Sequence, residues 1–441
     1  MLLTIEKLIY GGDGLARTPP DADGRSMAVF LPFVLPGEKV EAQIRPEKAG
    51  FARGSIEQIL EASTDRVEAP CPYFRQCGGC HYQHIGYERQ VQLKAGILRE
   101  TVRRIAKIEL PSEIRLHPSP PWNYRNRTRL QVRTSPEFAL GYFRFGSREF
   151  LSVRACPISS PLINRTIEQL TDHGGFDCPA TIEEIELFSD AADEHLLAWA
   201  FAGRDADPPD LLRWAEAIQR EFPCLTGITF FSSRRGSRHG QGNEDESEPA
   251  VGLKSLAQSG ARSLRYRTRN HEYQVSAGAF FQVNRHLIDE LTAVVTGNAG
   301  GSLALDLYAG VGLFSTALAS SFRHIFSVEA SLTAHADLVQ NVPANVKAVG
   351  ARTEDYLRAS AMRGRPDLVV LDPPRTGAGK HVVHALLELG VPRIRYVSCD
   401  PATLARDIVP LVAAGYHVEE THLFDLFPET FHIESVLLLA R

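Results

Sequence analysis

Cys399 is the residue whose surroundings point most directly to chemistry. It stands in YVSCDPATLARD, residues 396–407, after a short apolar run and directly before Asp-Pro. Pro401 suits the first position of a helix and Asp400 suits its N-cap, so the thiol is predicted to lie at a helix N-terminus, whose partial positive charge favours a thiolate. Asp400 acts against this effect, and a buried, inert cysteine is the alternative. The position at the end of a predicted strand favours a nucleophile.

Two carboxylates follow strand-like runs in the same part of the chain. Asp372 lies in LDPPR, residues 371–375, where the prolines stiffen the loop. Amino-methyltransferases use a similar Asp-Pro-Pro followed by an aromatic residue, whereas Arg375 stands in that place here. Glu434 lies in FHIESVLLLAR and is costly to bury unless it is paired or neutral. A solvent-facing edge position is the alternative for Glu434, and the residue alone favours that alternative.

A glycine-containing turn indicates a nucleoside site. DLYAGVGLFS, residues 306–315, has Ser315 where a dinucleotide fingerprint has its third glycine, and Glu329 follows 23 positions after Asp306. A carboxylate there can accept hydrogen bonds from both ribose hydroxyls. No Lys-Ser/Thr pair follows the glycines, so the turn is not a P-loop. The motif favours an adenosine ligand without a polyphosphate, of which S-adenosyl-L-methionine is the common one; a generic turn is the alternative.

Four cysteines form a third candidate site. Cys71, Cys77 and Cys80 lie in CPYFRQCGGCHYQH, residues 71–84, and Cys156 is followed by Pro157. Four thiols in this arrangement can hold zinc or an iron–sulfur cluster, and the spacing alone does not choose between them.

The sequence also predicts the secondary-structure elements that position these residues. After residue 300, strand-like runs alternate with helix-length segments, which predicts a parallel sheet that binds ligands at the carboxyl ends of its strands. The strand-like runs are LALDLY, HIFSVE, VKAV, DLVVLD and RIRYVS. Residues 1–60 predict a small barrel, residues 87–108 a helix and residues 124–157 strands, while the polar stretch 232–249 predicts a mobile loop.

Length and composition bound the class of protein. A chain of 441 residues predicts two or three domains. The net charge of −5 argues mildly against a protein coated for nucleic acid, although seven arginines cluster between residues 123 and 154. The sequence has no apolar run long enough for a membrane span and no signal peptide, so we expect a cytoplasmic protein without membrane association.

Taken together, the motifs resemble those of the RNA (uracil-5-)-methyltransferases that act on 23S rRNA and tRNA. The resemblance is carried by CPYFRQCGGCHYQH, Cys156-Pro157, FFQVN at residues 280–284, DLYAGVGLFS, Glu329, LDPPR, SCDP and HIESV. It implies an α/β class I (Rossmann-like) methyltransferase domain with an N-terminal TRAM-like β-barrel and a central α+β domain. The expected boundaries are residues 1–62 for the barrel, 63–275 for the iron–sulfur and RNA-binding domain, and 276–441 for the methyltransferase domain.

The resemblance also implies roles for single residues. Cys399 is expected to be the nucleophile and Glu434 the base. The donor would contact Gln282, Tyr308, Glu329 and Asp372, and a 4Fe–4S cluster would be held by Cys71, Cys77, Cys80 and Cys156. Leu313 stands where the family often has a polar residue, and the adenine-facing residue after the third strand, of which Glu354 is a candidate, is not placed.

The expected reaction explains why a cysteine and a base are both needed. A thiolate that adds to carbon 6 of uracil turns carbon 5 into a nucleophile, and a base must then remove the carbon-5 proton so that the thiolate can leave. The target lies in structured RNA and must be flipped out. We expect 23S rRNA as substrate, with tRNA as the alternative, and no obligate protein partner. An adenine amino-methyltransferase and a non-catalytic zinc- or cluster-bearing RNA-binding protein are the rival hypotheses.

Overall fold

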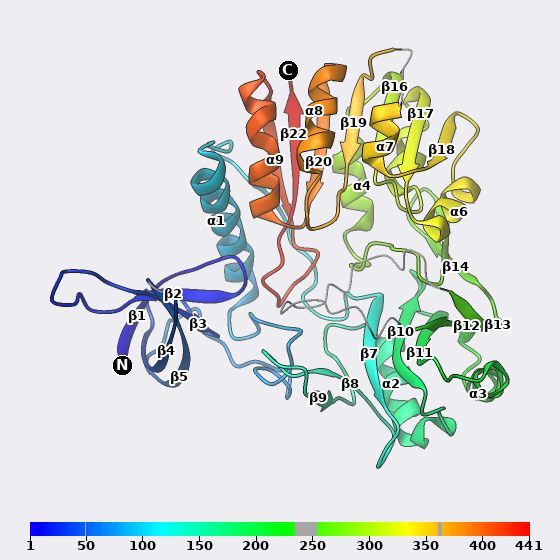
Figure 1. The fold of residues 1–441 in the computed structure, drawn as a ribbon, viewed down its shortest axis with the longest axis horizontal. Coiled ribbons are helices and arrows are strands. Elements are labelled where there is room, and N and C mark those ends of the chain that lie inside the picture. Colours follow the sequence, from blue (N-terminus) through cyan, green and yellow to red (C-terminus); the bar gives the residue numbers. More distant parts are fainter. Residues whose placement is uncertain (49, 234–253, 360–363) are drawn as a thin grey trace.

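The computed structural model of the chain describes residues 1–48, 50–233, 254–359 and 364–441. Its strands form a closed barrel, a seven-stranded sheet, a two-stranded sheet and an eight-stranded sheet. Figure 1 shows the barrel on one side of the molecule, and the eight-stranded and seven-stranded sheets one above the other on the opposite side. The predicted loop 232–249 lies, from residue 234 onwards, outside the described residues.

The N-terminal barrel forms because its strands alternate between buried apolar and exposed polar residues. Its strands are β1 (Leu2–Leu8), β2 (Asp13–Arg17), β3 (Ala28–Pro32), β4 (Lys39–Lys48) and β5 (Phe51–Glu61). In β1, for example, Leu3 and Ile5 point into the barrel core while Thr4 and Glu6 face outwards. The barrel predicted for residues 1–60 is therefore confirmed.

The central seven-stranded sheet carries helices on one face. In spatial order the strands are β13 (Ser255–Gly260), β12 (Leu225–Ser232), β11 (Leu196–Ala202), β10 (Ile182–Ser189), β7 (Arg127–Arg133), β8 (Ala139–Phe143) and β9 (Phe150–Ser152). The helices α2 (Pro161–Asp172) and α3 (Pro208–Glu221) share one hydrophobic core with this sheet. The strand β11, LLAWAFA, is buried along its whole length, as an apolar run without alternation predicts.

The C-terminal sheet contains the five strands that the sequence predicts after residue 300. In spatial order its strands are β18 (Val346–Gly350), β17 (Phe322–Glu329), β16 (Gly301–Leu307), β19 (Leu368–Leu371), β20 (Arg393–Ser398), β22 (Glu434–Ala440), β21 (His417–Phe424) and β6 (Arg115–His117). The sheet is not wholly parallel, because β22 runs antiparallel to both of its neighbours. The reason is the connection from β21 to β22, which is the loop 425–433 and not a crossover helix.

Helices cover both faces of this sheet. One core contains side chains of α4 (Ile288–Thr296) and α5 (Leu313–Leu318), and the other contains side chains of α8 (Gly379–Leu389) and α9 (Pro401–Ala413). The helices α6 (Leu332–Asn341) and α7 (Thr353–Ala359) follow β17 and β18. The β14–β15 hairpin (Ser263–Arg267 and Glu272–Ser276) contributes buried side chains to the first of the two cores.

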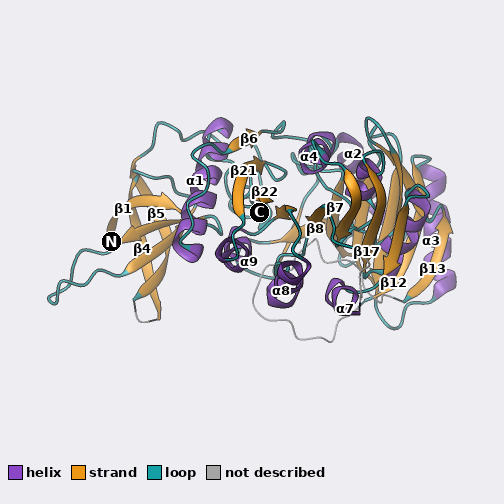
Figure 2. Cartoon of the chain, turned by 90° about the horizontal axis from the view of Figure 1, so that it is seen from above, coloured by secondary structure: helices purple, strands orange, loops and turns teal. Residues whose placement is uncertain are grey.

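The helix α1 (Tyr87–Ala106) joins the barrel side of the molecule to the C-terminal sheet. Its buried residues Ile97, Leu98 and Val102 belong to the same core as Leu404 and Ile408 of α9. Figure 2 shows α1 between the barrel and α9. The strand β6, which follows α1, pairs with β21 at the edge of the C-terminal sheet. Residues 87–117 thus pack on the C-terminal sheet, although the resemblance places them in the expected central domain, residues 63–275.

Within the residues that the structure describes, no helix is both long enough and apolar enough to cross a membrane.

Candidate active site

Most of the predicted site residues lie at one edge of the C-terminal sheet, the edge formed by the carboxyl ends of its parallel strands. The carboxyl ends of the parallel strands meet there, and the antiparallel β22 begins there. Tyr308 follows β16, Glu329 ends β17, Asp372 follows β19, Cys399 follows β20 and Glu434 begins β22. Ligands of open α/β sheets bind at this edge, so the topology alone brings these five residues together.

The predicted helix start after Cys399 is confirmed. The Oδ1 of Asp400 accepts hydrogen bonds from the backbone N–H groups of Ala402 and Thr403, at 2.9 and 2.8 Å, and Pro401 is the first residue of α9. The hydroxyl of Thr403 donates to the carbonyl of Arg375 at 3.0 Å. The half-buried Cys399 is therefore placed between a strand end and a capped helix, on a turn that is tied to the loop after β19.

Glu434 lies across the sheet from Cys399. In the antiparallel ladder of β20 and β22, Ser398 is opposite Ser435, and the hydroxyl of Ser435 donates to the carbonyl of Ser398 at 3.3 Å. Cys399 directly follows Ser398 and Glu434 directly precedes Ser435, so both residues adjoin the last pair of this ladder. The solvent-facing position that Glu434 alone suggested is wrong, because β22 lies between β20 and β21 and Glu434 is 5% exposed.

A chain of carboxyl groups runs along this edge. Burial, and then the charge of Asp372, raise the pKa of Glu434 well above its usual range, while Arg375 acts in the opposite direction. Burial and the charge of Asp306 raise the pKa of Asp372 to about 7. Burial raises the pKa of Asp306 to about 7, with a further upward contribution from Glu329. Buried carboxyl groups that repel one another suit a ligand with a positive charge, which a sulfonium carries.

Glu329 closes the turn that follows β16. Its Oε2 accepts a hydrogen bond from the backbone N–H of Gly310 at 2.9 Å, and its Oε1 accepts one from Ser331 at 2.6 Å. Burial raises its pKa, although these backbone hydrogen bonds act against the shift. Each carboxylate oxygen has two lone pairs, so both oxygens keep the capacity to accept a further hydrogen bond from a ligand hydroxyl.

The other predicted donor contacts lie at the flanks of the same edge. Tyr308 has φ = 66°, a left-handed conformation that is uncommon for a residue with a side chain. Burial and the charge of Glu354 raise the pKa of its hydroxyl, so Glu354 at the start of α7 is a neighbour of Tyr308. On the opposite flank, the buried Gln282 donates from Nε2 to Oδ2 of Asp372 at 3.5 Å.

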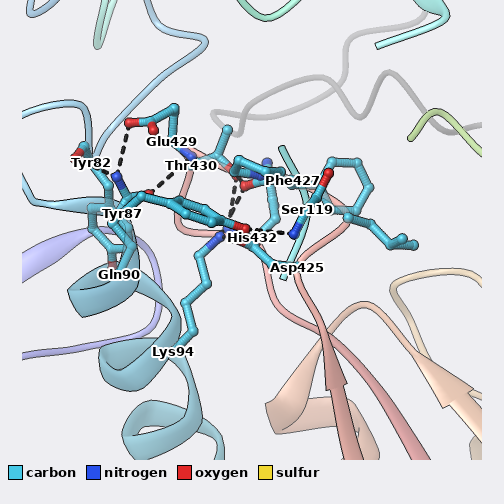
Figure 3. Close-up of polar contacts among 12 residues, drawn as sticks. Tyr82, Tyr87, Gln90, Lys94, Ser119, Asp425, Phe427, Glu429, Thr430 and His432 are labelled. Atoms are coloured by element: carbon cyan, nitrogen blue, oxygen red, sulfur yellow. Dashed lines mark hydrogen bonds and ion pairs between the residues drawn. The ribbon is translucent and has the colours of Figure 1, made fainter. Parts of the chain in front are cut away.

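The loop 425–433 leads directly into Glu434. Figure 3 shows that side chains of α1 form hydrogen bonds with this loop. The Nζ of Lys94 donates to Oδ1 of Asp425 at 2.6 Å and to the carbonyl of Phe427 at 2.9 Å. The Nε2 of Gln90 donates to Oε2 of Glu429 at 2.9 Å. Both members of the Lys94–Asp425 ion pair are fully buried. Helix α1 therefore fixes the segment that leads directly into β22.

The cysteine-rich segment, residues 71–84, and Tyr124 also contact the loop 425–433. The backbone N–H groups of His81 and Tyr82 both donate to the carbonyl of Glu429 at 2.9 Å, and the hydroxyl of Tyr124 donates to the carbonyl of Pro428 at 3.1 Å. The ring of His81 packs edge-on against that of Phe431, with centroids 4.6 Å apart. His81, the residue that follows Cys80, thus contacts the loop that leads into Glu434.

Sequence reasoning assigned no role to a basic pair beside Glu434. The Nη2 of Arg375 lies 3.3 Å from Nδ1 of His432. Burial, and then the charge of Arg375, lower the pKa of His432 well below its usual range, so the imidazole is neutral and its Nδ1 accepts from the guanidinium. Arg375 stands where amino-methyltransferases have an aromatic residue, and that substitution was the signal that could have found the pair.

The structure brings the four predicted cluster cysteines near one another. Burial, and then the charges of Cys156, Cys77 and Cys71, raise the pKa of Cys80 well above its usual range, while a hydrogen bond with Gln83 acts against the shift. Burial and the charge of Cys156 also raise the pKa of Cys71. Crowded thiols that repel one another as thiolates are a donor set that a cationic metal centre neutralises. Across the described ranges, no three Cys, His, Asp or Glu side chains are arranged to hold a single metal ion.

Part of the arginine cluster is structural. Arg127 and Arg129 both lie against the buried Glu186, and Nε of Arg129 donates to its Oε2 at 2.9 Å. Burial lowers the pKa of Arg127 to about 10, and the neighbouring Glu186 opposes this shift. Arg133 and Arg148 are exposed, so a phosphate backbone can reach them.

Comparisons with known proteins identify the family of this chain. The family model "tRNA (Uracil-5-)-methyltransferase" matches residues 257–441, and the TRAM domain model matches residues 1–56. A 23S rRNA (uracil(1939)-C(5))-methyltransferase of Halomonas elongata is 32% identical over 100% of this chain and 89% of its own length. An RNA methyltransferase of Aquifex aeolicus is 31% identical over 99% of this chain and 97% of its own length.

A solved structure shows the same fold. The tRNA (uracil-54, C5)-methyltransferase of Pyrococcus abyssi, in complex with S-adenosyl-L-homocysteine, has a TM-score of 0.72 and 23% identity, with 100% of both chains covered. The barrel, the central domain and the methyltransferase sheet are therefore confirmed as the predicted fold class. The chain belongs to the RNA uracil-5-methyltransferase family, and it is an S-adenosyl-L-methionine-dependent enzyme that methylates carbon 5 of a uridine in RNA.

Proposed function

We propose that Cys399 is the nucleophile of this reaction and Glu434 its base. The observation that supports the proposal is the register of β20 and β22, whose last pair, Ser398 and Ser435, directly adjoins Cys399 and Glu434 at the ligand-binding edge of the sheet. The Cys399 thiolate adds to carbon 6 of the uracil, and the π electron pair moves to carbon 5 and the adjoining carbonyl. After carbon 5 has taken the methyl group, Glu434 removes its proton, and that electron pair restores the double bond and expels the thiolate.

S-Adenosyl-L-methionine supplies an electrophilic methyl group, and we assign its binding to Gln282, Tyr308, Glu329 and Asp372. The carboxyl chain along the sheet edge supports this assignment, because a bound cation stabilises carboxylates whose pKa values burial has raised. The same cation would lower the pKa of Glu434, which must be ionised to act as a base. Donor binding would thus prepare the base that finishes the reaction.

A methyl-transfer assay tests the role of Cys399. The Cys399→Ala enzyme is expected to transfer no methyl group, because no covalent activation of carbon 5 is then available. Cys224→Ala is the matched control, since Cys224 is another half-buried thiol but precedes β12 in the seven-stranded sheet. Turnover by Cys399→Ala at the wild-type rate would refute the proposal and would favour the amino-methyltransferase chemistry that Asp-Pro-Pro suggests.

The proposed substrate is 23S rRNA. One finding supports it: the Halomonas relative named for that substrate matches 100% of this chain and 89% of its own length. Mass spectrometric mapping of 5-methyluridine in rRNA and tRNA, from strains with and without the gene, tests this directly. Loss of 5-methyluridine from 23S rRNA is expected, and loss from tRNA with intact rRNA would assign the enzyme to tRNA.

We further propose that Cys71, Cys77, Cys80 and Cys156 hold a 4Fe–4S cluster that cross-links the central domain. The mutual effect of the thiols on their pKa values supports a shared centre. Zinc is the alternative centre, because four thiolates suit it equally well.

Metal analysis of anaerobically purified protein tests the cluster. About four irons per chain and a brown colour are expected, the count of that cluster type. The Cys80→Ala protein should lose the iron while Cys224→Ala keeps it. A colourless wild type with one zinc per chain would refute the assignment.

A further inference from the structure

We propose that Tyr10, a residue of the N-terminal barrel, is a positioning residue for the nucleophile, so that the barrel forms part of the active site. The inference rests on the proposed role of Cys399. A barrel that serves only to bind RNA could be displaced from the methyltransferase sheet without effect on the chemistry. In this structure the barrel instead contacts the turn that carries the thiol.

The contact is made by the turn between β1 and β2. The hydroxyl of Tyr10 donates to the backbone carbonyl of Cys399 at 3.2 Å. The ring of Tyr10 packs edge-on against Phe431, with centroids 5.7 Å apart and planes at 86°. Phe431 belongs to the loop 425–433, which leads into Glu434. One tyrosine thus touches both segments that carry the proposed catalytic pair.

The turn that presents Tyr10 is fixed from behind. The backbone N–H of Ile9 donates to the carbonyl of Asp13 at 2.9 Å and closes the turn. Gly12 has φ = 94°, and a Cβ at this position would lie 3.2 Å from the ring of His81. A glycine is therefore needed both for the backbone conformation and for the close approach to the cysteine-rich segment.

Electrostatics keep the Tyr10 hydroxyl in its donating form. Burial, and then the charge of Asp400, raise its pKa, and the charge of Cys399 adds to this effect. The hydroxyl therefore stays protonated and can donate its hydrogen bond. Asp400 is itself held by the two helix N–H groups that it caps, so the hydroxyl of Tyr10 faces a fixed turn.

A second contact of the barrel supports the same conclusion. Phe33 directly follows β3, and its ring centroid lies 4.8 Å from that of Phe145 in the central domain. The ring centroids of Phe145 and His81 are 6.0 Å apart. His81 in turn packs on Phe431. Aromatic contacts therefore run without interruption from the barrel through the cysteine-rich segment to the loop before Glu434.

Tyr10→Phe tests the proposal in the full-length holoenzyme, because it keeps the ring against Phe431 and removes the hydroxyl. Tyr416→Phe is the matched control: the buried Tyr416 hydroxyl also donates to a backbone carbonyl, that of Val391, but beyond the far end of α9. The readouts are kcat, the KM for RNA, and the rate at which RNA containing 5-fluorouridine becomes covalently bound.

We expect Tyr10→Phe to lower kcat and the trapping rate about five- to tenfold, the effect of one hydrogen bond, with the KM for RNA unchanged. Tyr416→Phe should leave all three values unchanged. A wild-type trapping rate in Tyr10→Phe, a raised KM with unchanged kcat, or equal losses in both variants would each overturn the proposal. Failure of the wild type to trap RNA would instead refute the role of Cys399.

Discussion

Replacing Lys94 by methionine tests how strongly α1 holds the loop before Glu434. Methionine keeps the length of the side chain and removes its charge and its donors. Two hydrogen bonds are lost, to Oδ1 of Asp425 and to the carbonyl of Phe427, and the Asp425 carboxylate stays buried without its cation. Breaking a buried ion pair in this way costs about 3–5 kcal/mol of the free energy of unfolding.

Urea unfolding, followed by circular dichroism, measures this loss. Lys39→Met is the matched control, because Lys39 pairs with Glu61 at 2.8 Å but the two side chains are 46% and 63% exposed. An exposed pair contributes about 1 kcal/mol or less. The double variant Lys94→Met/Asp425→Leu should recover much of the stability, since no unpaired charge then remains.

If Lys94→Met shifts the unfolding midpoint no more than Lys39→Met does, the Lys94–Asp425 pair does not fix the loop. We also expect the kcat of Lys94→Met to fall at temperatures where the protein is still folded, because the loop leads directly into Glu434.

Two further predictions concern the donor site and pH. Glu329→Ala should weaken S-adenosyl-L-methionine binding by about 1–3 kcal/mol in calorimetry, as for other charged hydrogen bonds, and unchanged donor affinity would contradict the assignment. Burial is the main cause that raises the pKa of Glu429 from 4.5 to about 7, so the folded state holds this proton more tightly than the unfolded state does. Its stabilising effect is full below pH 4.5 and is lost as the pH rises to 7. Glu429→Gln should therefore gain stability relative to the wild type over this interval, by up to roughly 3 kcal/mol, and a difference independent of pH would refute the shift.

Local sequence patterns predicted the elements that are determined locally. The strands that end beside Asp372 and Cys399 are short apolar runs followed by turn residues, and the cap at Asp400 follows from its chemistry and from Pro401. Because the carboxyl ends of parallel strands share one edge, the order of strands and helices along the chain is enough to place these residues together.

The contacts that complete the site could not be predicted in this way. Glu434 is buried because β22 inserts between β20 and β21, and the order of strands in a sheet is not written in any one strand. Lys94 and Asp425 lie 331 positions apart, and Tyr10 and Cys399 lie 389 apart, so tertiary packing alone brings each pair together. Lys94 also stands in a helix with many charged residues, where nothing local distinguishes it from its exposed neighbours.

Covalent trapping tests the central claim most directly. Enzyme is incubated with S-adenosyl-L-methionine and RNA that contains 5-fluorouridine, and the products are separated on a denaturing gel. The wild type should form a stable complex, since fluorine cannot leave as a proton does, and Cys399→Ala should form none. With ordinary RNA, Glu434→Gln should accumulate a covalent complex that still carries the carbon-5 proton, because addition and methylation precede the removal of that proton. A stable complex in Cys399→Ala, or rapid turnover without any complex in Glu434→Gln, would contradict the account.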